Sequence, residues 1–381
     1  MSVHIPFNKP YMSGKELFYI AQAHANAKLA GDGPFTEKCK KQIELITGVN
    51  SALLTHSCTA ALEIAALLLD IEPGDEIIMP SYTFVSTANA FVLRGGVPVF
   101  VDIRPDTLNI NEALIEAVIT PRTRAIAVVH YAGVPCEMNE ILRIAQKYQL
   151  KVVEDAAQGF MSTYHGAPLG GIGDLGAFSF HETKNIISGE GGALLVNDFS
   201  LIERAEIIRE KGTNRKQFFR GIVDKYTWQE VGSSYLPGEI IAAFLWAQLE
   251  EARSITDKRL AIWNVYHQLL ASSEERGLLR RPIILDGCQH NGHMYYVLLP
   301  KSVDRQRVID ALARVMINTV FHYAPLHSAP AGLQLGKTSG PMDVTNDVAE
   351  RILRLPLWVD ITHEEQEKVC GSLLRIIENM T

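Results

Sequence analysis

The sequence predicts an α/β protein whose larger domain is built on a mostly parallel β-sheet. Short runs rich in β-branched residues alternate with helix-forming segments from residue 51 to residue 154. This alternation is typical of parallel strands that are buried on both faces by helices. The chain has 381 residues, of which 47% are hydrophobic and 21% charged, which is enough for more than one core. We therefore expect a large domain over residues 1–240 and, after a long connecting helix, a smaller α/β domain within 241–381.

Composition and charge exclude several classes of function. The net charge of −7 argues against a general affinity for nucleic acid or for an anionic membrane. No apolar run approaches the length of about 18 residues that a transmembrane helix needs, and the N-terminal MSVHIPFNKP lacks the blocks of a signal peptide. Five cysteines form no CxxC pair and twelve histidines no HExxH motif. We therefore expect a cytoplasmic protein without a metal site.

The first elements are a helix over residues 16–30, a breaker cluster at 31–34 and a strand over 52–55. The small polar turn Ser57–Thr59 follows this strand and leads into a helical pattern over 60–70. Such a turn presents unpaired backbone N–H groups and the positive end of a helix dipole, which together can bind a phosphate. The alternative is that Ser57 or Thr59 caps the helix without a ligand.

The alternation then continues through the next hundred residues. Strands are predicted at 76–79, 97–101, 124–130 and 151–154, and helices at 85–93, 112–119 and 138–148. Ligands of such sheets bind beyond the carboxyl ends of the strands. The turn at Ser57, the segment 81–84 and Asp155 all follow predicted strands. These three features are therefore expected to converge on one site.

Asp155 follows an apolar strand and precedes Ala156 and Ala157, so we expect its carboxylate to be poorly solvated. A buried carboxylate needs a cationic partner or several hydrogen-bond donors. A protonated ring nitrogen of a cofactor would meet that need. The alternative is that Asp155 caps the following helix.

Lys184 lies in a turn between two predicted strands, 177–180 and 193–196, and the turn closes on Gly189–Gly192. In an apolar setting desolvation lowers the pKa of an amine, which can then form a Schiff base with an aldehyde. A single lysine is more often a solvated surface group, so Lys184 alone would not establish such a site.

Together these parts meet the requirements of pyridoxal phosphate. The cofactor needs a lysine, an acidic group at its ring nitrogen, a helix N-terminus for its phosphate and an aromatic face. Lys184, Asp155, the turn at 57–59 and Phe84 supply these groups. A dinucleotide oxidoreductase would instead need GxGxxG after the first strand, and residues 55–59 contain no glycine.

Five motifs carry a resemblance to a known family: GDGPFTE (31–37), PSYTFVSTANA (80–90), VFVDI (99–103), VVEDAAQ (152–158) and FSFHETKN (178–185). Through them the whole chain resembles the DegT/DnrJ/EryC1/StrS sugar aminotransferases, which share the fold type I architecture of pyridoxal-phosphate-dependent aminotransferases. Members that carry histidine in place of the lysine are dehydratases. Since Lys184 is present, the resemblance implies transamination.

The resemblance also implies roles for individual residues. Lys184 would form the Schiff base with the cofactor, Asp155 would pair with the pyridine nitrogen, and Gln158 would lie near the phenolic oxygen. Phe84 would stack on the cofactor ring. The phosphate would be bound by the backbone N–H groups of Cys58 and Thr59 and by the hydroxyl of Ser179.

Residues 210–236 resemble most closely the dTDP-4-amino-4,6-dideoxygalactose transaminase branch of the family. This likeness implies amino transfer from glutamate to dTDP-4-dehydro-6-deoxyglucose, for the synthesis of a surface polysaccharide. Other nucleotide keto-sugars stay open, including a 3-keto isomer and a UDP or GDP sugar, as does a non-catalytic regulator that binds the cofactor. Gly232–Leu236 replaces the family's usual Gly-x-Asn-x-Arg pattern, so either Ser234 or no residue takes over the phosphate contact from a partner subunit.

The same segment holds Lys211, Arg215, Lys216 and Arg220 within ten residues. A solvated basic loop is one interpretation, and binding of a nucleotide diphosphate, with Arg215 and Arg220 as candidates, is another. By the resemblance this segment would cross to a second copy, which makes a homodimer with active sites at the subunit interface the expected assembly.

The C-terminal part is expected to contain a long helix over 240–270, a strand over 294–299 and helices at 305–315 and 364–380. Within it, FHYAPLH (321–327) contributes Tyr323 and His327. The family resemblance places this region near the sugar nucleotide. Either residue could equally be a packed core group.

Overall fold

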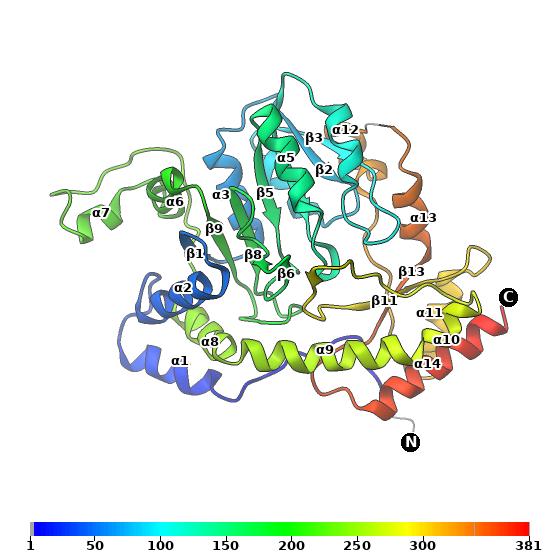
Figure 1. Cartoon of the computed structure of the whole chain (residues 1–381). Coiled ribbons are helices and arrows are strands. Elements are labelled where there is room, and N and C mark those ends of the chain that lie inside the picture. Colours follow the sequence, from blue (N-terminus) through cyan, green and yellow to red (C-terminus); the bar gives the residue numbers. More distant parts are fainter. Residues whose placement is uncertain (1–3, 339, 381) are drawn as a thin grey trace.

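The computed structural model describes residues 4–338 and 340–380 and contains a large central sheet with a smaller sheet beside it (Figure 1). The central sheet has eight strands in the order β1-β9-β8-β5-β4-β2-β3-β12. Their bounds are β1 Ser51–Thr55, β2 Glu76–Pro80, β3 Val97–Val101, β4 Thr123–Val129, β5 Lys151–Asp155, β8 Leu175–Ser179, β9 Gly192–Val196 and β12 Lys337–Thr338. All neighbours are parallel except β9, which is antiparallel to both β1 and β8. The predicted fold class, a mostly parallel α/β sheet, is confirmed.

The helices cover the central sheet and surround the smaller one. Their bounds are α1 Glu16–Ala25, α2 Pro34–Thr47, α3 Cys58–Leu68, α4 Val85–Val92, α5 Met138–Tyr148, α6 Ile202–Arg209, α7 Arg215–Phe219, α8 Glu239–Glu250, α9 Ala252–Leu269, α10 Ala271–Glu275, α11 Arg305–Arg314, α12 Pro330–Leu335, α13 Asp343–Arg351 and α14 His363–Glu378. Within the described ranges, no helix combines the length and the apolar character that a bilayer crossing requires.

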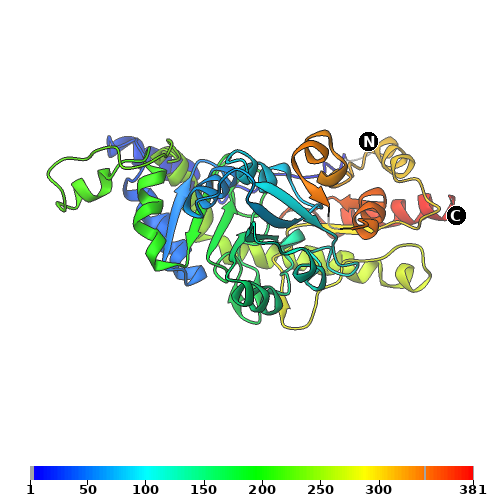
Figure 2. The same ribbon diagram turned by 90° about the horizontal axis from the view of Figure 1, so that it is seen from above.

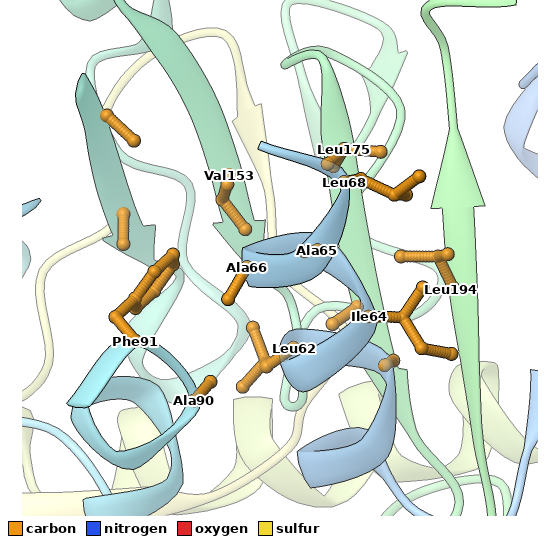
Figure 3. Packing of buried hydrophobic residues seen from close by; sticks show 14 of the residues in the cluster. Leu62, Ile64, Ala65, Ala66, Leu68, Ala90, Phe91, Val153, Leu175 and Leu194 are labelled. Carbon is orange, nitrogen blue, oxygen red and sulfur yellow. The ribbon is translucent and has the colours of Figure 1, made fainter. Parts of the chain in front are cut away.

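The apolar face of α3 forms the centre of the largest buried cluster. Leu62 and Ala66 on α3 lie against Val153 of β5, and Leu175 and Leu194 of β8 and β9 lie close by (Figure 3). All five side chains are at most 2% exposed, so this face makes a continuous contact with the sheet. Burial of each of the leucine and valine side chains stabilises the fold by about 1.5–3 kcal/mol. The start of α3 is thereby fixed relative to the strand ends.

Three predicted helices differ from the observed ones. The first helix ends at Ala25 because Ala27 takes a left-handed conformation with φ 53°. The segment 112–119 forms two short 3₁₀ turns in place of one helix, and a run of this length is below what helix nucleation favours. The long helix is divided at Glu251 into α8 and α9. Helix α2 was not predicted.

The smaller sheet pairs β11 (Tyr295–Leu298) with β13 (Ile352–Leu355) in antiparallel register. Its buried side chains pack with α9, α11 and α14 around Tyr266, Leu312 and Leu373. By contrast, Ala242 and Leu245 of α8 share a buried cluster with Phe35 of α2. The domain boundary at residue 240 stays a prediction.

Residues 210–236 extend away from the body of the molecule and include the short helix α7 (Figures 1 and 2). We call this stretch the extended segment. Several large apolar side chains on it are exposed, among them Phe219, Ile222 and Trp228, at 68%, 65% and 77%. Such a cluster of apolar groups is typical of a surface that contacts another protein.

Candidate active site

A cavity of about 510 Å³ lies where the carboxyl ends of central strands meet the smaller sheet. The central sheet and its loops contribute Ser57, Cys58, Thr59, Thr83, Phe84, Ser86, Val129, Asp155, Ala157, Gln158, Ser179, His181, Lys184 and Glu190. The remaining lining comes from both ends of the chain and includes Phe7, Asn8, Arg259, His293, Met294, His322, Tyr323, Arg354 and Leu357. Every predicted cofactor contact is therefore found at one cavity.

The turn after β1 presents the N-terminus of α3 to this cavity. Ser57 takes an extended conformation, and its Oγ accepts a hydrogen bond of 3.1 Å from the Ala60 N–H, so Ser57 is the N-cap. The N–H groups of Cys58 and Thr59 precede the first intrahelical bonds and can bind an anion. A Cβ on Gly192 would lie 2.5 Å from the Cys58 nitrogen. Glycine at the start of β9 therefore allows the hairpin of β8 and β9, whose loop carries Lys184, to approach the turn at Ser57–Thr59.

Asp155 ends β5, and its side chain is only 5% exposed. Its Oδ2 accepts a hydrogen bond of 2.6 Å from Thr87 Oγ1, and its Oδ1 accepts one of 3.1 Å from the Ala157 N–H. Thr83 Oγ1 lies 2.8 Å from Thr87 Oγ1 and extends this chain. Among the residues that the structure describes, no cation forms an ion pair with Asp155. Two hydrogen bonds alone leave a buried carboxylate undercompensated, so the site has room for a positive charge.

Lys184 lies in the loop that joins β8 to β9, and its side chain is half-buried at the cavity. Removal from water lowers its pKa, while the carboxylate of Asp155 opposes this shift and the guanidinium of Arg354 adds to it. A larger fraction of the Lys184 amine is therefore unprotonated than in a solvated lysine, and the unprotonated amine is the form that attacks an aldehyde. Burial raises the pKa of the Cys58 thiol well above its ordinary value, so this group stays neutral.

Gln158 and Tyr323, which both line the cavity, are joined by a hydrogen bond. Gln158 Nε2 donates to the Tyr323 hydroxyl at 2.8 Å, and its Oε1 accepts from the Ala132 N–H at 2.7 Å. Tyr323 has a left-handed φ of 41°, and its ring stacks on His322 with centroids 3.6 Å apart. Phe84 is 56% exposed, and its ring centroid lies 6.3 Å from that of Tyr323. The Phe84 face is therefore open to a ligand.

Three of the predicted substrate contacts lie outside the cavity lining. His327 Nδ1 is 2.7 Å from Ser81 Oγ. Arg215 and Arg220 belong to the extended segment and pair with Glu210 at 2.9 Å and Glu206 at 2.8 Å. Ser234, the candidate for the partner-subunit phosphate contact, is exposed and forms an isolated β-bridge with Glu210. A role for these arginines at a substrate would require a second copy of the chain.

Several residues in or next to the cavity escaped the sequence analysis. Thr87, which holds Asp155, lies within a quoted motif but was given no role. His293 Nδ1 lies 2.9 Å from Asn185 Oδ1, next to the lysine in sequence. Arg259 and Arg354 carry no motif, although Arg354 is a single charge within the apolar run Ile352–Leu357 and could have been noticed for that reason.

The donor set of the cavity fits pyridoxal phosphate. A helix N-terminus faces the cavity for the phosphate, and Asp155 supplies an uncompensated carboxylate for a protonated ring nitrogen. Lys184 supplies an amine with a lowered pKa. The four requirements set out from the sequence, including the exposed face of Phe84, thus meet in one place.

Comparison with known proteins identifies the family. The profile of the DegT/DnrJ/EryC1/StrS aminotransferase family matches residues 10–374. The chain belongs to this family. Aminotransferases of this family use pyridoxal phosphate, so the protein is a pyridoxal-phosphate-dependent sugar aminotransferase, as the resemblance implied.

Two relatives extend this comparison. The spore coat polysaccharide biosynthesis protein SpsC of Bacillus subtilis is 32% identical over 385 aligned residues, which cover 98% of this chain and 97% of SpsC. The crystal structure of the aminotransferase TlmJ from Streptoalloteichus hindustanus superposes with a TM-score of 0.91 at 28% identity and full coverage of both chains.

A third relative has a named biosynthetic role. Helicobacter pylori PseC, an aminotransferase involved in the biosynthesis of pseudoaminic acid, superposes with a TM-score of 0.90 at 25% identity. The alignment covers 99% of this chain and 100% of PseC. The fold type I architecture predicted from the motifs is therefore confirmed.

Proposed function

We propose that this aminotransferase moves the amino group of glutamate to the 4-keto carbon of dTDP-4-dehydro-6-deoxyglucose, which gives dTDP-4-amino-4,6-dideoxygalactose for a surface polysaccharide. The observation that carries the proposal is the meeting of Lys184 and Asp155 at one solvent-connected cavity. The resemblance of residues 210–236 to this branch of the family supports the acceptor. The name of SpsC supports a role in polysaccharide synthesis.

When bound, pyridoxal phosphate supplies a conjugated ring that takes up the electron pair left at the reacting carbon. Asp155 would hold the proton at the ring nitrogen, and the Thr87 hydroxyl fixes the orientation of its carboxylate. The N–H groups of Cys58 and Thr59 and the hydroxyl of Ser179 would bind the phosphate. These residues would hold the cofactor next to Lys184.

Lys184 moves protons in both halves of the reaction. In the first half its Nζ takes the proton from the α-carbon of glutamate, and in the second half it delivers a proton to C4 of the sugar. The lowered pKa of Lys184 favours the base form that the first transfer requires. The face from which Nζ delivers the proton sets the configuration at C4. The hydrogen bond between Gln158 and Tyr323 fixes the positions of these two side chains at the cavity.

We further propose that the active unit is a homodimer in which the extended segment contacts a second copy. The exposed side chains of Phe219, Ile222 and Trp228 support this assembly, because burial of such groups favours association. Sedimentation equilibrium of the wild type is expected to give twice the chain mass, and Trp228→Glu is expected to weaken the association. A monomeric wild type with full activity would contradict the assembly.

The decisive experiment is incubation of the purified protein with pyridoxal phosphate, glutamate and a panel of nucleotide keto-sugars. The panel contains the 4-keto and 3-keto isomers as dTDP, UDP and GDP sugars, and product masses and proton coupling constants identify the aminated carbon and its configuration. The proposal expects the axial 4-amino product from the dTDP 4-keto sugar at the highest kcat/KM. Preference for another sugar would correct the substrate, whereas an absorbance band that glutamate does not bleach would indicate a non-catalytic regulator.

A further inference from the structure

His293 is a buried histidine of the cavity that has no role in the mechanism described above. It precedes β11, is only 6% exposed, and lines both the main cavity and a small recess of about 10 Å³ beside it. Its backbone is held on both sides, since its N–H donates to Asn291 Oδ1 at 3.0 Å and its carbonyl accepts from Arg259 Nη2 at 2.7 Å. The ring therefore has a fixed place in the wall of the cavity.

The hydrogen bonds around Asn185 determine which nitrogen of the His293 ring carries the proton. Asn185 Nδ2 donates to the Asn291 carbonyl at 2.9 Å, and a carbonyl oxygen can only accept. The other amide atom, Oδ1, is therefore the one that lies 2.9 Å from His293 Nδ1. Because this oxygen also only accepts, Nδ1 must carry the proton. Nε2 of the neutral ring is then an acceptor with a free lone pair.

The His293 ring is neutral, and its acceptor nitrogen has no partner in the part of the chain that the structure describes. Burial lowers the pKa of His293 well below its ordinary value, and the charges of Lys184 and Arg259 lower it further. The hydrogen bond of the ring to Asn185 uses Nδ1 and leaves Nε2 unbonded. A buried acceptor without a donor is unfavourable, so a donor that reaches Nε2 would be bound.

The small recess limits the donors that can reach Nε2. Besides His293, its polar lining consists of Gln158, Ser179, Lys184, Asn185 and Asn291. Each of the three amide nitrogens already donates elsewhere, one to the Tyr323 hydroxyl and two to backbone carbonyls. Ser179 is the proposed ligand of the cofactor phosphate. Of these side chains, Lys184 therefore supplies the donor that remains without a partner.

Lys184 and His293 are also connected through the lysine loop. Asn185, which holds the His293 ring, directly follows Lys184 in the chain. A recess of about 10 Å³ is close to the space that one water molecule needs, and a lysine amine is carried on a flexible stem. The amine can thus reach Nε2 by rotation of its side chain or bind it through one water molecule.

We propose that His293 Nε2 accepts a hydrogen bond from Lys184 Nζ when the lysine is not bonded to the cofactor. The bond leaves the lone pair of the amine free for the reacting carbon, and it stabilises the ammonium that forms when Nζ takes up a proton. The proton stays on Nζ and returns to carbon, so His293 remains neutral throughout. This inference rests on the proposed function, because it presupposes that Lys184 moves protons. It adds to that function a positioning residue for the lysine.

Two substitutions of His293 separate the roles of its two nitrogens. Glutamine places an amide oxygen near the position of Nε2, whereas asparagine places its amide near Nδ1 and leaves no acceptor at Nε2. Stopped-flow bleaching of the holoenzyme absorbance by glutamate measures the donor half-reaction. We expect His293→Asn to lower its rate by about 10- to 100-fold, since one hydrogen bond to a charged group is lost. His293→Gln should stay within about threefold of the wild type.

A second measurement follows the Lys184 amine in the cofactor-free protein, without turnover. Trace acetylation with acetic anhydride, quantified at Lys184 by peptide mass spectrometry over a range of pH, gives the pKa of the amine. Loss of the acceptor destabilises the ammonium, so this pKa should fall by about one unit in His293→Asn and by less than about 0.3 unit in His293→Gln. The other titratable groups near the amine are the same in both variants, namely Cys58, Asp155, His322 and Arg354.

His290 provides the matched control. It lies in the same loop, and its Nδ1 accepts from the Gly292 N–H at 3.2 Å, but it is not part of the lining of the cavity or of the recess. His290→Asn and His290→Gln should therefore leave both the bleaching rate and the pKa of Lys184 as in the wild type.

The two nitrogens of His293 predict opposite outcomes. If His293→Gln were as slow as His293→Asn, packing of the ring would explain the loss, and the inference would be overturned. It would also be overturned if His293→Asn kept the wild-type rate and the wild-type pKa of Lys184, because the bond from Nδ1 to Asn185 would then be the only role of the ring. A wild-type holoenzyme that glutamate does not bleach would instead overturn the proposed function, whereas the acetylation result would stand.

Discussion

The cavity and the extended segment differ in how their charges are compensated. In the extended segment Arg215 pairs with Glu210, and Lys216 and Arg220 both pair with Glu206, so these three cations have carboxylate partners in their own chain. In the cavity Asp155 and Arg354 have no ionic partner among the described residues. The apolar groups show the opposite pattern, since Phe219, Ile222 and Trp228 are exposed on the segment, whereas around the cavity Phe84 is exposed but Met294 and Leu357 are buried. The comparison indicates that charged groups without an ionic partner are typical of a ligand-binding site. Exposed apolar side chains are typical of a surface that associates with another protein.

The largest effect is expected at the cavity. Lys184→Ala should lower turnover by at least about 10³-fold, because it removes the group that moves both protons. The absorbance of the bound cofactor should lose the protein-linked band. Lys151, which pairs with Asp174 and Asp198 away from the cavity, gives the control Lys151→Ala. Full turnover in Lys184→Ala would contradict the mechanism.

The second effect concerns the uncompensated carboxylate. Asp155→Asn should lower kcat by about 10²–10³-fold, because a neutral amide no longer stabilises a positive charge at the ring nitrogen. It should also weaken cofactor binding, as measured by fluorescence titration. Glu182→Gln, an exposed carboxylate in the lysine loop, is the control that should retain activity. Equal kcat in Asp155→Asn and the wild type would show that Asp155 only holds the loop.

A smaller effect is expected at Thr87, which is hydrogen-bonded to Asp155. Thr87→Val removes the hydroxyl that donates to Asp155 at 2.6 Å and keeps the shape of the side chain. Loss of one hydrogen bond to a charged group costs about 1.5–3 kcal/mol, so kcat should fall by about 10- to 100-fold. Thr87→Ser, which keeps the hydroxyl, should restore most of the rate. If Thr87→Ser and Thr87→Val were equally slow, packing and not the hydrogen bond would explain the loss.

The smallest effect is expected in the extended segment. Arg215→Gln breaks an ion pair whose arginine is 43% exposed, and such surface pairs contribute at most about 1 kcal/mol. Urea denaturation should show a change below that value, and the KM for the nucleotide sugar should change less than about threefold. A tenfold rise in that KM would instead support the prediction that this arginine binds the diphosphate, in the cavity of a second copy.

Some of the cavity residues could be predicted from the sequence. Asp155 and the turn at Ser57 were predictable because each follows a strand directly, so the strand itself brings the residue to the sheet edge. Lys184 was predictable from the hairpin that holds it. The position of each of these residues thus follows from the strand or hairpin that carries it.

The remaining cavity residues depend on long-range packing. Arg354 and His293 come from parts of the chain more than 100 residues beyond Lys184, and their positions follow from the docking of the smaller sheet. The first helix ended early because of a left-handed Ala27, a conformation that the amino-acid type disfavours. His293 and the left-handed Ala27 leave no local pattern in the sequence, and the only local signal of Arg354 is its single charge within the apolar run Ile352–Leu357.

Strand β9 has a consequence for the order in which the protein is made on the ribosome. It joins β1 to β8 by register pairs such as Ser51 with Val196, so β1 waits about 145 residues of synthesis for the one neighbour that it has among the described strands of the sheet. Closure of so long a loop makes folding slow relative to helix formation. Until Val196 has emerged, the nascent chain carries an unpaired apolar edge, which makes this interval the stage at which aggregation or a chaperone competes with folding.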